Sequence, residues 1–373
     1  MSRRIGRLGS RLVPDQSPAP DDKVVPTRTD SEQRRLLILR WVLVACQAAT
    51  ILISWPLWYT RNDPPLLPAL PFPSVDMAIP LLISLALVLR YPLWGAVVHA
   101  VVLAASVGMD QTRLQPEVVS MALLLLTATG YRNLVLVART HVLTLWFWAG
   151  LAKLLSEPFY EVRGPWMFEG LPLPPALDGL GTHFGAVVIF LEMGAGIFSV
   201  PVRTRRIGVA LAIAVHGGAL LTLGPLGHNW NEIIWPWNIA LAVAAVTLIA
   251  PWTRSVPTEL ARSSWPLRLV VAFLALFPAG YYVGAADAYL SHHLYSDDTP
   301  GAVVCDRRRI CGGDLSLEPI DAVRAPLPPE HRLFRAVFDK TCEPGEVLRI
   351  RDPRRWYAER DWERVRQCRN QAD

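Results

Sequence analysis

Charged residues are scarce in this chain. Only 18% of its 373 residues are Asp, Glu, Lys or Arg, whereas about a quarter is usual in a soluble domain. The mean hydropathy is +0.28, and together the two values argue against an ordinary water-soluble enzyme. The net charge of +5 is small and dispersed along the chain, so we expect no nucleic-acid partner.

Cysteine is nearly missing outside the C-terminal tail, since only Cys46 precedes that tail. An even number of cysteines in a small external domain favours two disulfides, whose pairing the sequence leaves open. A zinc site is the alternative, but the chain has no C-x-x-C pair, and free thiolates oxidise outside the cell. The four cysteines concerned are Cys305, Cys311, Cys342 and Cys368. In the same tail, apolar residues at helical spacing predict an amphipathic helix over 354–369.

Long apolar blocks dominate the rest of the sequence. Nine of them come near the length of about 20 residues that a helix needs to cross a bilayer. Only helices and closed barrels satisfy backbone hydrogen bonds in lipid. These blocks are continuously apolar and do not alternate between apolar and polar residues as barrel strands do, so we expect helices. We predict an all-α polytopic membrane bundle of about nine transmembrane helices, with a small disulfide-containing external C-terminal domain. The predicted spans are 37–58, 76–90, 92–109, 117–137, 140–156, 184–200, 207–226, 233–251 and 267–285.

Positive charges gather in alternate connections between these blocks. With nine spans, the cationic segments all fall on one side, which predicts a cell-membrane protein with a cytoplasmic N-terminus and an external C-terminus. The cations concerned lie in the N-terminal segment and at Arg90, Arg132, Arg139, Arg203, Arg205, Arg206, Arg254, Arg262 and Arg268. We therefore predict a disordered cytoplasmic segment over 1–35, the bundle over 36–286 and the external domain over 287–373.

Three ionisable residues lie in consecutive apolar blocks, namely Lys153, Glu192 and His216. Charge inside a membrane is costly, so such residues are candidates for function. We predict that the three meet in an externally open cavity as catalytic groups, with Lys153 as a base in a dry pocket. Two alternatives stay open. Lys153 can extend to the interface without any chemical role, and Glu192 and His216 can make interhelical hydrogen bonds that hold the bundle together.

Two external segments carry polar and aromatic residues that are candidates for substrate binding. The loop 157–183 is long for a connector and contains Trp166 and Glu169, and long loops often act as lids. A second cluster contains His228, Asn229 and Glu232. The alternative is an aromatic belt at the headgroup level. The spacing fits no recognised metal-ligand motif, so we predict no metal site.

One segment of the bundle resembles a known family. Residues 148–154 read WAGLAKL and are followed by an external loop with Trp166 and Gly170; Glu192, the cationic turn 203–206 and His216 add to the likeness. Over roughly residues 36–286 the chain is similar to the membrane domain of vitamin K-dependent gamma-carboxylases, shared with the horizontally transferred transmembrane (HTTM) domain proteins of bacteria.

The resemblance implies a role for Lys153. This residue occupies the position of the carboxylase lysine that acts as the base starting vitamin K hydroquinone oxidation, so the implied cofactor is a quinol. Some members of the family instead assist the maturation of secreted peptide toxins. The chain departs from the pattern in its longer loop and in the Trp166-to-Gly170 spacing. It also has a much shorter C-terminal region than the one with which carboxylases bind their protein substrate.

Three functions follow as hypotheses. The first is a membrane enzyme that acts from the external face on a quinol or a secreted peptide, with Lys153 as base. The second is a non-enzymatic membrane partner for the maturation or export of a secreted protein. The third, a transporter, is less favoured because the sequence shows no internal repeat and no paired broken helices. In all three the lipid bilayer is a partner.

Overall fold

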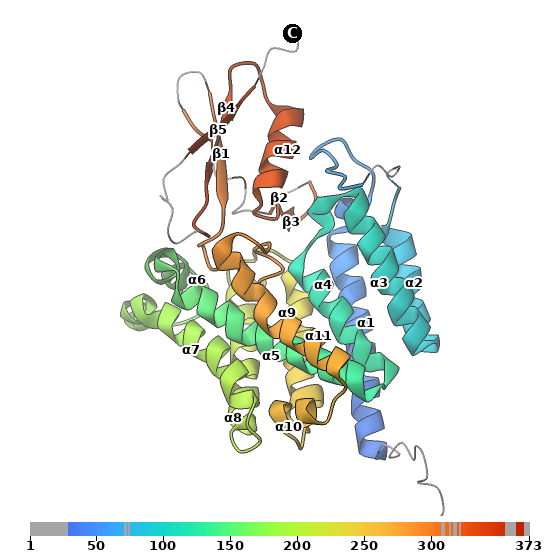
Figure 1. The fold of residues 1–373 in the computed structure, drawn as a ribbon. Coiled ribbons are helices and arrows are strands. Elements are labelled where there is room, and N and C mark those ends of the chain that lie inside the picture. The colour runs from blue at the N-terminus through green and yellow to red at the C-terminus, as the bar shows by residue number, and fades with distance from the viewer. Residues whose placement is uncertain are drawn as a thin grey trace, which may run out of the picture.

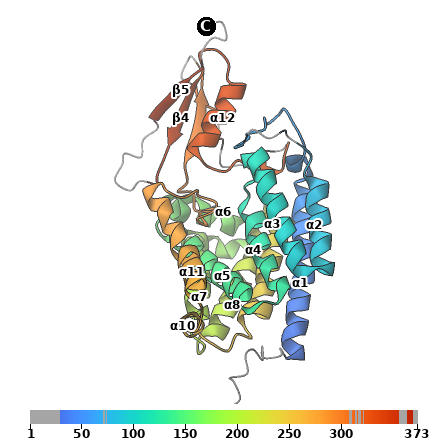
Figure 2. The same ribbon diagram turned by 45° about the vertical axis from the view of Figure 1, so that its right-hand side comes forward.

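The computed structural model describes residues 29–70, 73, 75–306, 310–312, 315, 319–320, 322–354 and 363–368. Within these ranges the chain forms a helical bundle with a small mixed domain at one end (Figure 1). When the view is turned by 45°, the small domain is still at one end of the bundle. The start of α1 (Asp30–Ile53) and the short helix α10 (Val256–Ala261) lie at the opposite end (Figure 2).

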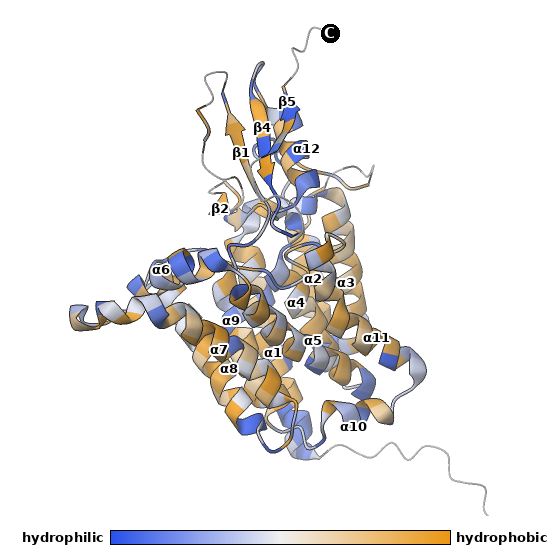
Figure 3. Cartoon of the chain, turned by 60° about the vertical axis from the view of Figure 1, so that its left-hand side comes forward, coloured by the Kyte–Doolittle hydropathy of each residue, from blue (hydrophilic) through white to orange (hydrophobic). Residues whose placement is uncertain are grey.

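Six helices in the described part of the chain are long and apolar enough to cross a membrane. Most of their residues are hydrophobic (Figure 3), and large apolar side chains such as Trp94, Phe190 and Phe273 are exposed on their surface. An apolar surface of this kind is stable in lipid and unstable in water. The prediction of a multi-pass membrane protein in contact with the bilayer is therefore confirmed. Four of the six are α1 (Asp30–Ile53), α3 (Pro92–Met109), α5 (Arg132–Leu154) and α8 (Arg205–Leu223). The other two each join two helical segments, namely η5 with α7 (Gly181–Ser199) over Pro175–Ser199 and α11 (Trp265–Leu276) with η7 over Trp265–Val283.

Three shorter apolar helices coincide with the remaining predicted spans. They are α2 (Ala78–Arg90), α4 (Pro116–Leu124) and α9 (Ile234–Ala244). The last two continue as helical turns of another type, a 3₁₀ segment to Thr129 and a π-helical segment to Ile249. Short helical segments connect the longer ones. These are η1 (Trp55–Trp58), η2 (Gln111–Arg113), η4 (Phe159–Arg163), α6 (Gly164–Glu169), η5 (Pro175–Leu180), α10 (Val256–Ala261) and η7 (Phe277–Val283).

The boundary between the fourth and fifth predicted spans was wrong. The sequence placed it near residue 139, but α5 begins at Arg132, after Gly130 ends the preceding helix in a left-handed conformation with φ of 76°. Glycine adopts this conformation without a steric penalty, which makes it a common helix terminator. Arg139 therefore lies inside α5, where it contacts Glu259 at 3.8 Å and the ring of Trp252.

The C-terminal domain contains strands, which the all-α prediction did not include. β1 (Gly301–Cys305), β4 (Val347–Arg351) and β5 (Glu363–Gln367) form an antiparallel sheet in the order β1-β4-β5. The helix α12 (His331–Thr341) packs on this sheet through Phe334 and Phe338. A two-stranded ladder of β2 (Pro319–Ile320) and β3 (Ala325–Pro326) completes it.

Two disulfides staple this domain, as predicted. Cys305 pairs with Cys311 and Cys342 with Cys368, and a core this small gains much of its stability from such links. The helix predicted over 354–369 is wrong at 363–367, where β5 pairs with β4 instead. Its other residues, apart from Arg354 and Cys368, lie outside the described ranges. Cross-strand pairing overrode the helical spacing, because the strand buries Val365 against the domain core.

Polar contacts join the domain to the bundle and to the segment that leaves it. Glu330, which is 3% exposed, accepts a hydrogen bond from the backbone N–H of Ala288 at 2.8 Å and pairs with Arg354 at 2.7 Å. Arg332 makes a bidentate pair with Asp287, and Gln115 at the start of α4 donates to the Pro326 carbonyl. The domain is thus fixed at the point where the chain leaves the bundle.

The Asp352 carboxylate is expected to make the domain sensitive to acid. Burial alone would raise the pKa of Asp352, but hydrogen bonds from His331 and Arg354 hold it well below the ordinary value. The stabilisation is therefore complete above the unfolded-state pKa of about 4 and decreases as the pH falls below it. We expect Asp352→Asn to destabilise the domain by about 2 kcal/mol at pH 7. The difference in unfolding free energy between the variant and the native protein should become smaller from pH 4 to pH 2.

Hydrogen exchange of the β4 amides in the full-length protein measures this effect. The ratio of exchange rates in Asp352→Asn and native protein at each pH cancels the intrinsic pH dependence of exchange. Asp339→Asn is the matched control, because Asp339 pairs with Arg366 on the surface and exposed pairs contribute little. A ratio that stays constant down to pH 2 would contradict the prediction.

Candidate functional site

Close packing of α5 on α7 positions the candidate catalytic residues. A Cβ atom built on Gly150 would lie 2.7 Å from the backbone nitrogen of Met193, and one on Gly196 would lie 2.9 Å from the backbone nitrogen of Phe147. Only glycine lets two backbones approach this closely. Lys153 lies one helical turn beyond Gly150 and Glu192 lies beside Met193, so the two polar side chains face each other across the contact.

Lys153 and Glu192 form a buried ion pair. The Nζ atom of Lys153 is 2.9 Å from Oε2 of Glu192, and Lys153 is only 4% exposed. The ammonium also donates to the carbonyls of Ala149 at 3.5 Å and Leu294 at 3.4 Å. Lys153 therefore does not extend to the surface. Two oppositely charged groups held out of water in hydrogen-bond contact can exchange a proton between them.

His216 lies in a separate hydrogen-bond network. Its Nε2 atom accepts from the indole N–H of Trp146 at 2.9 Å, and its Nδ1 atom is 2.8 Å from Oδ1 of Asn238. Because the indole nitrogen can only donate, Nε2 is the acceptor and Nδ1–H donates to the amide oxygen. The imidazole is thus held as one neutral tautomer between α5, α8 and α9. It makes no hydrogen bond to Lys153 or Glu192.

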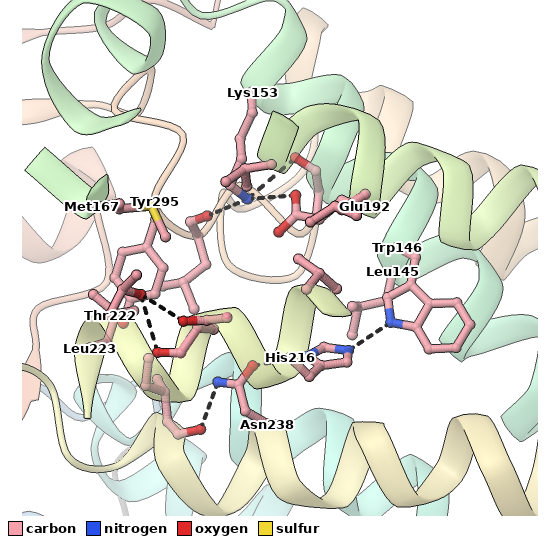
Figure 4. A pocket seen from close by; sticks show the side chains of 18 of the residues that line it. Leu145, Trp146, Lys153, Met167, Glu192, His216, Thr222, Leu223, Asn238 and Tyr295 are labelled. Atoms are coloured by element: carbon pink, nitrogen blue, oxygen red, sulfur yellow. Dashed lines mark hydrogen bonds and ion pairs between the residues drawn. The ribbon is translucent and has the colours of Figure 1, made fainter. Parts of the chain in front are cut away.

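All three residues nevertheless line one cavity of about 100 Å³ between α5, α6, α7, α8 and α9. Figure 4 shows Lys153 and Glu192 at one end of it and His216 with Asn238 at another. Thr222 and Tyr295 add polar atoms on a third side. Most of the wall is apolar, which fits a ligand that is itself mostly apolar. The apolar residues include Leu145, Met167, Phe184, Val188, Leu223 and Ile234.

The five predicted substrate-binding residues do not line this cavity. Trp166 stacks on His228 with ring centroids 4.0 Å apart, and His228 donates from Nε2 to the Trp166 carbonyl at 2.7 Å. Glu169 and Asn229 are exposed, while Glu232 lies 3.7 Å from Arg324. Trp166 and His228 thus form part of an aromatic cluster beside the cavity, and from this loop it is Met167 that reaches the cavity wall.

The segment 287–298, here called the strap, supplies cavity residues that the sequence did not identify. His292, Leu294 and Tyr295 line the cavity, although the sequence assigned them to the external domain. Burial is the main cause that lowers the pKa of His292 well below its ordinary value, and repulsion from the neighbouring His141 and His293 adds to it. The imidazole of His292 is therefore neutral at pH 7. The sequence offered no signal for this arrangement, because the strap has neither periodicity nor a motif.

The strap is tied to the bundle directly after its cavity residues. Asp297 makes a bidentate pair with Arg163, with N···O distances from 2.9 to 3.1 Å. Arg163 in turn stacks on Trp166 at 4.8 Å from the ring centroid. Ser156 donates to the Ser296 carbonyl. Arg163 thus joins the strap to the aromatic cluster beside the cavity.

Comparison with known proteins leaves the family open. No family model, no curated protein and no solved structure matches the chain. The chain is therefore described by its site: a membrane helix bundle with a buried Lys153–Glu192 pair facing a mostly apolar cavity.

Proposed function

We propose that the protein is an integral membrane enzyme that takes a proton from a lipid-soluble quinol bound in the cavity. The observation that carries this proposal is the Lys153–Glu192 pair at the end of a mostly apolar cavity, 2.9 Å across, with Lys153 buried and Glu192 partly buried. A quinol has an apolar ring and acidic hydroxyl groups, so it complements both parts of the site. The resemblance to the gamma-carboxylase and HTTM membrane domains supports the same chemistry.

The pair can act as a base without leaving net charge in the cavity. The quinol hydroxyl gives its proton to Lys153, which passes its own proton to the Glu192 carboxylate, and the quinolate takes the place of that carboxylate as counter-ion of the ammonium. One anion then replaces another beside Lys153, so no unpaired charge is buried. His216 has both ring nitrogens hydrogen-bonded; its role is to shape the wall between α5, α8 and α9.

We also propose the topology that places this site near the outer leaflet. Nine apolar helical segments cross the membrane, with the N-terminus in the cytoplasm and the disulfide domain outside. The disulfide domain and the arginine-rich end of the bundle around α10 lie at opposite ends of the molecule (Figures 1 and 2). Disulfides persist outside the cell and arginines gather at the cytoplasmic face, so both features support this orientation.

Filling the cavity tests whether a ligand binds there. A Cβ on Gly218 or on the adjacent Gly217 would meet no atom within 4 Å, but only Gly218 lines the cavity. We expect Gly218→Leu to lose at least tenfold in affinity for a short-tailed naphthoquinol added to protein in nanodiscs, because the new side chain occupies its volume. Gly217→Leu is the matched control and should bind like the native protein. Equal binding by both variants would contradict the proposal.

The second candidate function is the escort of a secreted protein, which would bind to the external domain. Deleting residues 287–373 does not separate the two functions, because the deletion also removes the strap that lines the cavity. The Gly218→Leu variant separates them, since an escort that works through the external domain keeps its activity when the cavity is filled.

A further inference from the structure

The strap has strained backbone at three positions within six residues. His292, Tyr295 and Asp297 have φ values of 64°, 58° and 56°, a region that side-chain-bearing residues adopt at a cost in free energy. Asp297 is compensated by its ion pair with Arg163, and Tyr295 by a hydrogen bond from Asn231. Among the described residues, no side-chain hydrogen bond or ion pair holds His292, whose ring contacts the ring of His141 at 5.6 Å between centroids.

His292, which is partly buried, differs from the fully buried histidines in and around the bundle. Each of those has a hydrogen-bond partner, whereas neither ring nitrogen of His292 has one among the described residues. His292 also lines the cavity. A polar side chain left unpaired at the wall of a mostly apolar cavity loses free energy unless something in the cavity bonds to it. The other contacts are His99 with Ser84, His141 with Ser120, His216 with Trp146 and Asn238, and His293 with Ser291.

The strap is held firmly enough to present this imidazole at a fixed place. Before His292, Asp287 is paired with Arg332, and the backbone of Ala288 bonds to Glu330. After it, the Leu294 carbonyl accepts from Lys153, and the Asp298 carbonyl accepts from Tyr281 at 2.5 Å. A side chain on a segment anchored at both ends loses little entropy when it binds a ligand.

We infer that His292 is a ligand-binding residue of the cavity, and that it hydrogen-bonds a second polar atom of the molecule whose first polar atom meets the Lys153–Glu192 pair. This inference rests on the proposed function, because it concerns the same bound molecule. A neutral imidazole has one donor and one acceptor nitrogen, so it can serve the far hydroxyl of a quinol. It also makes the strap part of the binding site.

Two substitutions separate a binding role from a structural one. Glycine adopts the left-handed conformation freely, so His292→Gly removes the imidazole and relieves the strain. Asparagine tolerates the same conformation better than most residues, so His292→Asn keeps a short polar group there. If His292 were only structural, the glycine variant would fold and bind at least as well as the asparagine variant.

The experiment measures anaerobic binding of a tritiated short-tailed naphthoquinol to full-length protein in nanodiscs, with the dimethyl ether of the same quinol as competitor. The native protein should prefer the quinol, because the ether has the same apolar body and no hydroxyl donors. We expect His292→Gly to lose about tenfold in quinol affinity, as for one lost hydrogen bond, with little change for the ether. His292→Asn should retain most of the preference.

The outcomes distinguish this inference from the proposed function. If His292→Gly and the native protein show the same preference for quinol over ether, while Gly218→Leu still weakens quinol binding at least tenfold, the role of His292 is overturned and the cavity function stands. Absence of quinol binding by the native protein overturns both. If His292→Gly weakens quinol binding but the quinol is still ionised in Lys153→Met, then Lys153 is not the base, while the binding role of His292 holds.

Discussion

Lys153→Met is expected to abolish ionisation of a bound quinol and to destabilise the bundle. General-base catalysis contributes roughly 100-fold to 10,000-fold to rates, and without the ammonium the quinolate also lacks a counter-ion. The variant leaves the Glu192 carboxylate buried beside apolar groups, and breaking a buried pair on one side costs about 3 kcal/mol. The quinol's absorbance reports the first effect, because its anion absorbs at longer wavelength than the neutral form. Thermal unfolding in detergent reports the second.

A double variant separates the two effects. Lys153→Met with Glu192→Met replaces the pair by two apolar side chains of similar length, and such replacements often restore stability. We expect the double variant to unfold close to the native temperature and still to leave the bound quinol neutral. If the quinol remains ionised in both variants, the Lys153–Glu192 pair is not the base.

Much of the bundle could be predicted because membrane spans follow from local composition. Apolar blocks of the right length identify helices wherever the chain must satisfy its backbone in lipid, and the two disulfides followed from the cysteine count in the tail. The helix boundary at Gly130 was missed because the few polar residues around it, Arg132 and Asn133, are followed directly by another apolar run. Hydropathy does not distinguish a glycine that ends a helix from one that packs inside it, such as Gly150.

The candidate site was predicted in part for a similar reason. Lys153 and Glu192 stand out because charge inside an apolar block is rare, and the structure brings them together. Spans that are consecutive in sequence need not present their polar residues to one another, and His216 bonds instead to Trp146 and Asn238. His292 could not be found, since its place in the cavity depends on how the strap folds back onto the bundle.

Gly150→Ala is expected to separate Lys153 from Glu192 although it adds only one methyl group. The new Cβ would lie 2.5 Å from Cγ and 2.7 Å from the backbone nitrogen of Met193. The side chain can move, but the backbone of α7 can make room only if the helix shifts. Overpacking of this kind costs about 3 kcal/mol, and the same shift lengthens the ion pair from its 2.9 Å. We expect a lower unfolding temperature together with weaker quinol ionisation.

Gly217→Ala is the control for the glycine change itself. It lies in the interior of α8, where a Cβ would meet no atom within 4 Å, so alanine should be neutral or slightly stabilising through its higher helix propensity. A pair of cysteines at 153 and 192, oxidised in the native background and in Gly150→Ala, measures the separation directly. Efficient crosslinking in the native background and its loss in Gly150→Ala is the expected pattern, because a disulfide requires Cα atoms within about 7 Å. Equal crosslinking in both backgrounds would show that α7 accommodates the methyl group. Gly150 would then not be what holds Lys153 against Glu192.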